Sequence, residues 1–255
     1  MPGDHRDDVQ IVPAGDAAFL VEWPGRIDPD VNARAVALAR ALREGALPGV
    51  RDIVPAYCSV GVFFDPLRSH VDELRAWLRQ AADVDRSIAA PARSRSSGPV
   101  EDAGDAGSIR RIPVCYGGDY GPDLEELATS AQLRRDEAVA AHTGRVYRVY
   151  MLGFMPGFAY MAEVDAGIAR PRRPTPRLKV PAGSVGIAGR QTGIYPLDSP
   201  GGWNIIGRTP LRPFDPRRGA TAEAFAFHPG DRVQFYAIDE AEYARLAAAA
   251  RATSR

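Results

Sequence analysis

The chain has 255 residues, of which 45% are hydrophobic and 8% aromatic, and its 32 basic side chains balance its 32 acidic ones. This length fits one large domain or two small ones, and the composition is that of a globular protein. Because the formal net charge is zero, no overall field attracts nucleic acid or a membrane surface, and we expect neither as a partner.

Residues 8–84 predict a small α+β domain. Apolar residues that alternate with others, such as Val9 and Ile11, indicate strands, and Asp28 followed by Pro29 is typical of a helix start. The expected order is ββαββα: two strands within residues 8–22, a helix from Asp28 to Gly45, strands over residues 50–54 and 60–64, and a helix over about residues 69–81. This order predicts antiparallel strands with helices on one face, related to the ferredoxin-like folds.

The composition changes in residues 85–108. From Ser87 to Ser108 the chain consists almost entirely of alanine, arginine, serine, glycine, proline and acidic residues. A segment without large apolar side chains cannot offset the entropy that it loses on ordering. We therefore expect a flexible linker between two domains.

Residues 109–240 predict a second, mainly β domain. Short strand-like segments alternate with turns rich in glycine and proline, a pattern typical of a β-barrel or sandwich. The expected strands cover residues 111–116, 146–152, 185–188, 204–207 and 232–238, and short helices begin at Pro122 and Asp136. A final helix, capped by Asp239, is expected within residues 240–255.

The N-terminus and the cysteines bear on the cellular compartment. The first residues, MPGDHRDDVQ, lack the apolar core of a signal peptide, and no segment approaches the length of a transmembrane helix. Cys58 and Cys115 lie in or beside apolar strand-like segments, so we expect two buried free thiols and no disulfide framework. These features predict a cytoplasmic protein.

The stretch from Met151 to Pro216 is the most informative part of the sequence. About a third of it is glycine or proline, yet it also contains several aromatic residues. Glycine and proline fix unusual backbone angles and aromatic rings need packing partners, so we expect ordered loops that form a binding surface. The loops are residues 153–158, 181–184 and 200–203, and the polar residues between them that can contact an amide or a carboxylate are Gln191, Thr192 and Tyr195.

A basic cluster lies within the same stretch. Few acids separate its members, which are Arg170, Arg172, Arg173, Arg177, Lys179 and Arg190. Such a cluster is either a solvated loop or an anion site for phosphate or carboxylate. Lys179 is the only lysine of the chain, and a desolvated amine can act as base or nucleophile, although the sequence favours a surface residue. Ser184 has no visible neighbouring base, which favours a turn serine over a nucleophile.

Common catalytic motifs are missing from the sequence. There is no phosphate-binding Walker loop, no Gly-x-Gly-x-x-Gly after a strand and no Gly-x-Ser-x-Gly elbow. The four histidines are scattered and lack metal-ligand spacing, so we expect no metal site.

Three long motifs resemble those of the KipI-like family. They are GFxPGFxYM from Gly153, PRxxxPRxxVPAGSVxIAGxQTGIYP from Pro171, and SPGGWxIIGRTP from Ser199. The resemblance covers about residues 111–238, including Val114–Gly118 and Gly121–Glu126, and is looser in the N-terminal domain. Members of this family are known as the B component of prokaryotic 5-oxoprolinase, as allophanate hydrolase subunit 1, or as carboxyltransferase domain subdomains C and D. The resemblance implies an α+β domain followed by a cyclophilin-like β-barrel.

The resemblance also implies a function and partners. It implies a protein that works with the C and A components of 5-oxoprolinase to hydrolyse 5-oxo-L-proline to L-glutamate at the expense of ATP, with Mg²⁺, and that is inactive alone. Candidate catalytic residues are Arg172, Arg177 and Gln191. The candidate substrate- or nucleotide-binding residues are Phe154, Pro156, Gly157, Phe158, Pro181, Gly183, Ser184, Thr192, Tyr195, Gly201, Gly202 and Trp203.

Two other functions are compatible with the family. One is a carboxyltransferase half-site in a biotin-dependent enzyme that acts on urea or a related amide. The chain does not carry biotin by the usual motif, because that motif places the lysine between methionines and Lys179 lies between leucine and valine. The other is a non-enzymatic inhibitor of a sensor histidine kinase.

Overall fold

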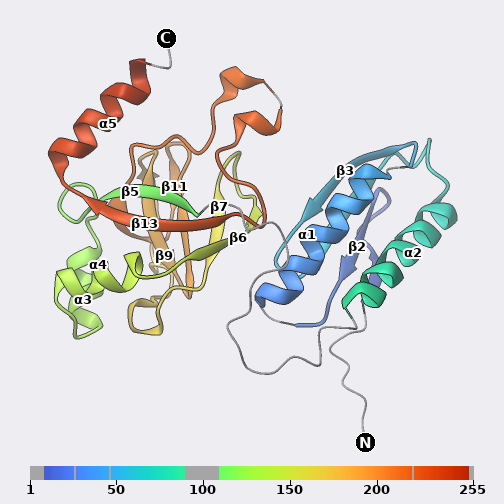
Figure 1. The fold of residues 1–255 in the computed structure, drawn as a ribbon, viewed down its shortest axis with the longest axis horizontal. Coiled ribbons are helices and arrows are strands. Elements are labelled where there is room, and N and C mark those ends of the chain that lie inside the picture. The colour runs from blue at the N-terminus through green and yellow to red at the C-terminus, as the bar shows by residue number, and fades with distance from the viewer. Residues whose placement is uncertain (1–8, 26, 46, 90–108, 220, 253–255) are drawn as a thin grey trace, which may run out of the picture. The chain divides into compact units, whose positions relative to one another are not determined.

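The computed structural model describes residues 9–25, 27–45, 47–89, 109–219 and 221–252, and for residues 84–89, 251 and 252 the backbone only. The chain divides into two compact units at residues 106 and 107 (Figure 1). Most of the predicted linker, residues 90–108, therefore lies outside the described residues. Within the described residues, no helix combines the length and the apolar composition that crossing a membrane requires.

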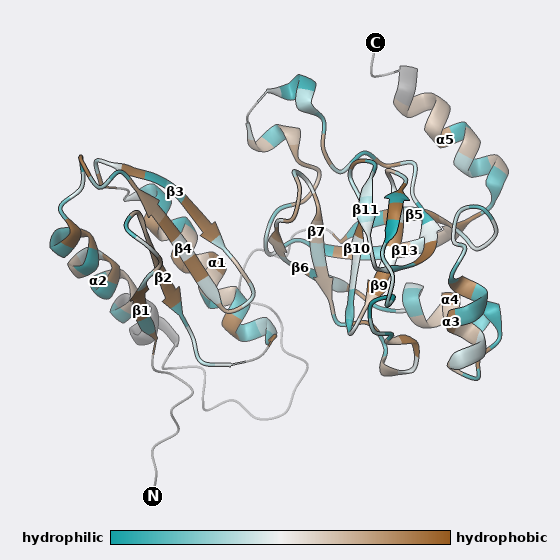
Figure 2. Ribbon diagram, turned by 180° about the vertical axis from the view of Figure 1, so that it is seen from behind, coloured by the Kyte–Doolittle hydropathy of each residue, from teal (hydrophilic) through white to brown (hydrophobic). Residues whose placement is uncertain are grey.

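The first unit contains a four-stranded antiparallel sheet with the strand order β1-β2-β4-β3. Helices α1 and α2 pack against each other and cover one face of the sheet (Figure 1). The hydrophobic residues gather along β2, β3 and β4 (Figure 2). The elements are β1 (Gln10–Pro13), β2 (Ala18–Glu22), α1 (Pro29–Glu44), β3 (Val50–Pro55), β4 (Ser59–Phe64) and α2 (Val71–Ala89).

Both helices of this unit begin close to where the sequence predicts. Helix α1 also ends as predicted, at Gly45, whereas α2 is longer than predicted. The Asp28 carboxylate accepts hydrogen bonds from the backbone N–H groups of Asp30 and Val31, as expected for a helix cap. Helix α2 continues to Ala89, into the predicted linker and beyond the predicted end at residue 81. Its buried stripe extends past Leu78 to Ala82, which keeps the helix packed on the core. The relation to ferredoxin-like folds stays a prediction.

The second unit is built around a closed seven-stranded barrel with the strand order β10-β7-β6-β13-β5-β12-β9. Strands β5 and β13 pair in parallel, so the first and last strands of the unit lie side by side in the barrel. The strands are β5 (Arg110–Tyr116), β6 (Tyr147–Leu152), β7 (Ala159–Ala162), β8 (Arg177–Val180), β9 (Ser184–Ala188), β10 (Gln191–Ile194), β11 (Ser199–Gly201), β12 (Asn204–Arg208) and β13 (Arg232–Ile238). A closed barrel agrees with the mainly β domain expected from the sequence.

Four strands of this unit are absent from the strands predicted above. Strands β7, β8, β10 and β11 have only three or four residues each, which is too short for a period of two to stand out. Strand β11 pairs with β8 in a separate two-stranded sheet. This small sheet carries part of the basic cluster.

Helices and short turns flank the barrel. Helices α3 (Leu124–Ser130) and α4 (Arg135–Thr143) lie together below it in Figure 1, and the excursion with the 3₁₀ turns η4 (Pro216–Arg218) and η5 (Ala222–Ala224) rises above it. A third 3₁₀ turn is η3 (Ala166–Ile168), and helix α5 (Glu240–Ala252) follows β13. The Asp239 side chain accepts the Glu242 backbone N–H and caps α5 as predicted.

Candidate functional site

The segment that precedes β8 is fixed along the barrel by backbone hydrogen bonds. The Gly189 N–H donates to Arg170 O at 2.5 Å, and the Arg173 N–H donates to Gly202 O at 2.7 Å. The buried amide of Asn204 reaches the same segment, donating to Pro171 O at 2.8 Å. These hydrogen bonds hold the segment with the basic cluster in place, unlike a solvated loop, whose backbone groups bond to water.

Asp123 is the buried carboxylate on which the basic cluster converges. Asp123 lies directly before α3, and only 3% of its surface is exposed. One oxygen accepts from Arg177 Nη2 at 2.6 Å and from Arg173 Nη1 at 2.9 Å, and the other accepts the Ile205 N–H at 2.6 Å. A buried carboxylate needs such partners to offset its desolvation. Arg177 therefore ties β8 to α3 and β12, and part of its charge is neutralised there.

Most other members of the basic cluster also face acids. Arg173 and Arg170 approach Glu126 at 3.4 and 3.8 Å. Arg190 pairs with Glu163 at 2.7 Å. Among the described residues, Arg172 is the member of the cluster that makes no ion pair.

Lys179 is exposed and paired with Asp198 at 2.8 Å. The hydrogen bond to Asp198 raises the pKa of the Lys179 amine, and the same bond lowers the pKa of the carboxyl. A lysine that acts as base or nucleophile needs the opposite shift, which desolvation produces. The structure thus agrees with a surface lysine.

The aromatic residues of the predicted surface form one cluster around Phe158. The Phe158 ring lies 4.7 to 5.6 Å from the rings of four others, which are Phe154, Tyr160, Tyr195 and Trp203. Three of the five are buried, whereas Tyr160 is half-buried and Phe154 is 64% exposed. The cluster therefore has a solid interior and one aromatic edge that faces solvent.

Arg172 lies close enough to this cluster to act on its hydroxyl groups. Burial raises the pKa of both Tyr160 and Tyr195, and the positive charge of Arg172 opposes that rise. The half-buried Tyr160 and the exposed Arg172 thus combine an aromatic face with a cation. This is the part of the predicted surface that can still meet a ligand.

Two glycines of the predicted loops fit tightly against the protein itself. Gly157 has φ +83°, and a Cβ there would lie 2.6 Å from Phe214 Cβ. A Cβ on Gly201 would lie 2.5 Å from the Tyr195 hydroxyl oxygen. Both positions require glycine because of internal packing. Gly183 is also held by the protein itself, since its N–H donates to Tyr195 O and its carbonyl oxygen accepts the Thr209 N–H. In contrast, Gly202, Pro156 and Pro181 are at least partly exposed.

Thr192 belongs to a buried hydrogen-bond chain inside the barrel. Its hydroxyl donates to Gly186 O at 3.1 Å and lies 3.0 Å from His142 Nε2. Nε2 is therefore assigned the proton, and His142 Nδ1 accepts the Tyr116 hydroxyl at 2.7 Å. Burial lowers the pKa of His142 to about 3, so the ring is neutral. Thr192 faces the core in this arrangement.

The remaining polar candidates differ in exposure. Ser184 is fully buried, and its hydroxyl has no hydrogen-bond partner among the described residues. Gln191 is half-buried at the start of β10. Within the described residues, no three histidine, cysteine, aspartate or glutamate side chains gather as metal ligands would.

The acidic partners of the cluster did not emerge from the sequence. Asp123 and Glu126 lie in the motif Gly121–Glu126, which was noted only for its resemblance, and Asp198 lies between two loops. A buried acid next to an apolar helix start is a signal, but its partners are about 50 residues away in the chain. Only the fold brings them together.

Residues 9–224 match the model of the family described as "Carboxyltransferase domain, subdomain C and D". The chain belongs to this family. It is 40% identical to the B component of 5-oxoprolinase from Bacillus subtilis over 92% of this chain and 95% of that protein. It is 50% identical to the B component of 5-oxoprolinase from Escherichia coli O157:H7 over 49% of this chain and 56% of that protein.

A solved structure supports the same fold. The crystal structure of TTHA0988 in space group P212121 superimposes with a TM-score of 0.72 at 37% identity and covers 87% of this chain. The chain spans 40% of the length of TTHA0988, so that protein contains a further part. The family resemblance seen in the three motifs is confirmed.

Proposed function

We propose that this chain is the B component of an ATP-dependent 5-oxoprolinase, which converts 5-oxo-L-proline, ATP and water into L-glutamate, ADP and phosphate. The observation that carries the proposal is the match to the B. subtilis B component along nearly the whole of both chains. A fold alone would not justify it, because one fold hosts many activities.

The chemistry requires activation of the substrate. A lactam is a poor electrophile, and transfer of the γ-phosphoryl group of ATP to its oxygen converts that oxygen into a leaving group. Such a site needs cations for the phosphate and for the substrate carboxylate, and donors directed at the developing charge. In this chain we assign the cation to Arg172, beside the aromatic edge formed by Tyr160 and Phe154.

Arg177 takes a different role in the proposal. Its guanidinium is held by the buried Asp123, so it positions β8 and does not meet the substrate directly. Gln191 remains a candidate for polar recognition because it is only half-buried. We assign Ser184 and Thr192 to the support of the barrel, since both are fully buried.

We further propose that the chain is inactive alone and acts with the C and A components of the enzyme. Arg172 and the aromatic edge can bind a charged ligand, but they are neither a general base nor a nucleophile. ATP, with Mg²⁺, would be bound with the help of a partner. The described residues offer no group of three metal ligands, and no step is assigned to a metal on this chain.

Reconstitution tests the proposal. Glutamate formation from 5-oxo-L-proline and ATP is measured with this chain alone, with the C and A components alone, and with all three proteins. Activity is expected only with all three. Full activity of the chain by itself would refute the shared site, and no activity of the complete set would refute the 5-oxoprolinase assignment.

Two variants separate the roles of the arginines. Arg172→Gln should fold and assemble normally, yet lower kcat/KM by about 100-fold, the cost of losing one preorganised charge contact. Arg177→Gln should lower the midpoint of urea unfolding, because Asp123 loses the closer of its two arginine partners. Arg190→Gln is the control, since Arg190 is exposed and pairs with Glu163 at the surface. A normal kcat/KM for Arg172→Gln would remove Arg172 from the site.

The family description supports a second candidate, a carboxyltransferase subunit of a biotin-dependent enzyme. In that case a biotinylated partner should copurify with the chain and be detected by streptavidin. Lys179 would not be the biotin carrier, because it is paired with Asp198 on a short strand.

A further inference from the structure

The described residues of the excursion between β12 and β13 are held by hydrogen bonds and ring packing. The Asp215 N–H donates to Ala224 O and the Ala226 N–H donates to Pro213 O, both at 2.8 Å. The rings of Phe214 and Phe225 lie 5.2 Å apart and close its base. These contacts hold the 3₁₀ turns η4 and η5 in place against each other.

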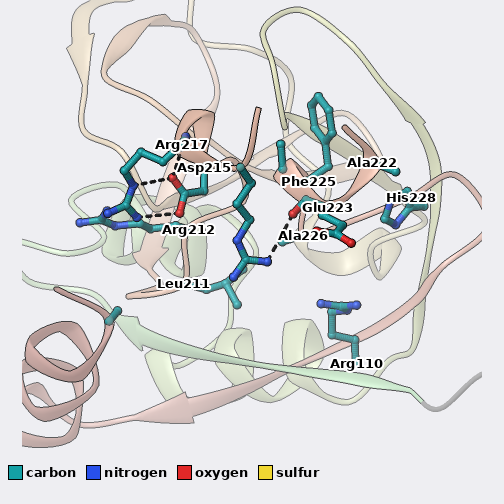
Figure 3. A pocket seen from close by; sticks show the side chains of 13 residues that line it. Arg110, Leu211, Arg212, Asp215, Arg217, Ala222, Glu223, Phe225, Ala226 and His228 are labelled. Atoms are coloured by element: carbon teal, nitrogen blue, oxygen red, sulfur yellow. Dashed lines mark hydrogen bonds and ion pairs between the residues drawn. The ribbon is translucent and has the colours of Figure 1, made fainter. Parts of the chain in front are cut away.

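A cavity of about 560 Å³ opens beside this excursion (Figure 3). Four arginines and a histidine line it, from two separate parts of the chain: Arg110 of β5, and Arg212, Arg217, Arg218 and His228 of the excursion. Leu211, Phe225 and several alanines form its apolar wall. The volume lies within the range of small-molecule sites, roughly 300 to 1,000 Å³.

The charges in this cavity do not cancel. Four arginines line it, against two carboxylates, Asp215 and Glu223. Asp215 is engaged by Arg217, whose Nη2 lies 2.6 Å from one of its oxygens and whose Nε lies 2.8 Å from the other. This hydrogen bonding lowers the pKa of Asp215 to about 2, so it stays ionised and bound to Arg217.

Arg110 and Arg218 supply the positive charge that remains. The Arg110 guanidinium lies 5.8 Å from the Phe227 ring centre and makes no ion pair among the described residues. Arg218 Nη1 donates to the Glu223 backbone oxygen at 3.4 Å, not to a carboxylate. Figure 3 shows Arg110 reaching toward the cavity from the side opposite Asp215 and Arg217. Two cations from different elements thus face one space.

We propose that this cavity binds a small molecule that carries a phosphoryl group. Guanidinium groups match the paired oxygens of phosphate, and an excess of positive charge suits a dianion better than a single carboxylate. The apolar wall has room for an organic remainder. The cavity shares no residue with the candidate site described above. If the ligand is ATP, the inference rests on the proposed function, and a phosphate ligand of another kind would make it independent of that function.

Two sources of the phosphoryl group are distinguished by the test. Isothermal titration of the full chain is carried out with inorganic phosphate, with ADP, with ATP and with 5-oxo-L-proline. Tighter binding of the nucleotides than of phosphate would show that the apolar wall contributes and that a nucleotide is the ligand. Equal affinities would identify the phosphate group alone. Both results support the proposal.

The variants Arg110→Gln and Arg218→Gln locate the binding. Each variant should lower the affinity for the phosphate ligand by about tenfold or more, as expected for the loss of one charge-assisted contact. Arg40→Gln is the matched control, because it removes one exposed arginine from the first unit and should leave the affinity unchanged. All three residues are exposed, so the variants are expected to fold.

Three results would overturn the proposal. They are no binding of any phosphate ligand, unchanged affinity in both cavity variants, or binding of 5-oxo-L-proline alone. These outcomes are independent of the proposed function, because they are measured without the A and C components. Conversely, a reconstituted complex without 5-oxoprolinase activity would leave a phosphate site in this cavity intact.

Discussion

The two arginine-rich regions of the second unit differ in where their counter-charges come from. In the first region, residues 170–190, acids from other elements meet most of the arginines, and Asp123 is the central one. In the second region, the cavity beside the excursion, the local Asp215 pairs with Arg217, and Arg110 and Arg218 make no ion pair among the described residues. The same residue type therefore serves internal structure in one region and an open anion site in the other.

The density of charge along a sequence therefore does not predict the electric field at a surface. The first region has more basic residues close together, yet the fold returns acids to it from about 50 residues away. The second region has fewer basic residues in sequence, and a distant β5 arginine adds to it. What decides is the burial and the pairing of each charge.

The largest change in stability is expected at Asp123, in the first region. An Asp123→Asn change should lower the free energy of unfolding by about 2 to 3 kcal/mol, because it leaves Arg173 and Arg177 facing a neutral amide in a partly buried place. Urea unfolding of the full chain, followed by circular dichroism, measures the loss.

The matched control is Glu126→Gln. Glu126 contacts the same Arg173, but its side chain is 64% exposed. Its removal should change the free energy of unfolding by no more than about 0.5 kcal/mol, the usual worth of an exposed ion pair. Equal losses in the two variants would contradict the view that burial sets apart the Asp123 pairing.

Much of the fold could be predicted from the sequence because its signals are local. Asp28 and Gly45 delimit α1 through capping, and the alternation of apolar residues gives the strand pairs of the first unit. The end of α2 could not be placed, since alanines carry its stripe beyond Leu78. Strands of three or four residues give no periodic signal, so only the pairing in the folded chain defines β7 and β10 in the barrel and β8 and β11 in the small sheet.

The sequence indicates which aromatic residues gather, but not how the charges pair. Aromatic residues from the loops within residues 153–203 pack around Phe158, as the composition of that stretch indicates. However, no local pattern links Arg177 to Asp123, which lies 54 residues earlier. Nor does a local pattern bring Arg110 to the excursion at residues 211–228. Contacts of this kind depend on strand order and are invisible to periodicity.

A smaller effect is expected at Asp215, in the second region. Asp215→Asn should strengthen the binding of a phosphate ligand about two- to fivefold, because it removes a carboxylate from the cavity and releases Arg217. The pKa of Asp215 is about 2, below its usual value, so the group is ionised at any pH above about 4. Asp215 is therefore charged at both pH 5 and pH 8, and its own titration contributes no pH dependence to the ratio of variant to parent affinity over this range.

The control for this measurement is Asp119→Asn. Asp119 is exposed, lies in the same unit and does not line the cavity, so its loss changes the net charge equally without touching the cavity. Isothermal titration with the same phosphate ligand compares the two variants. Equal strengthening by both would mean that overall charge governs the binding, and the cavity would not differ from the rest of the surface.

The smallest effect is expected at Lys179, the only lysine. Lys179→Met removes an exposed pair with Asp198, whose carboxylate still accepts the Ala182 N–H at 2.8 Å. The midpoint of urea unfolding should not change measurably, and the reconstituted complex should form glutamate at the parent rate. Because Asp198 raises the pKa of the amine, Lys179 is fully protonated near neutral pH and is a poor base. If Lys179→Met lost as much activity as is expected for Arg172→Gln, Lys179 would have to act in the site. The conclusion that the charges of the first region serve internal structure would then be wrong.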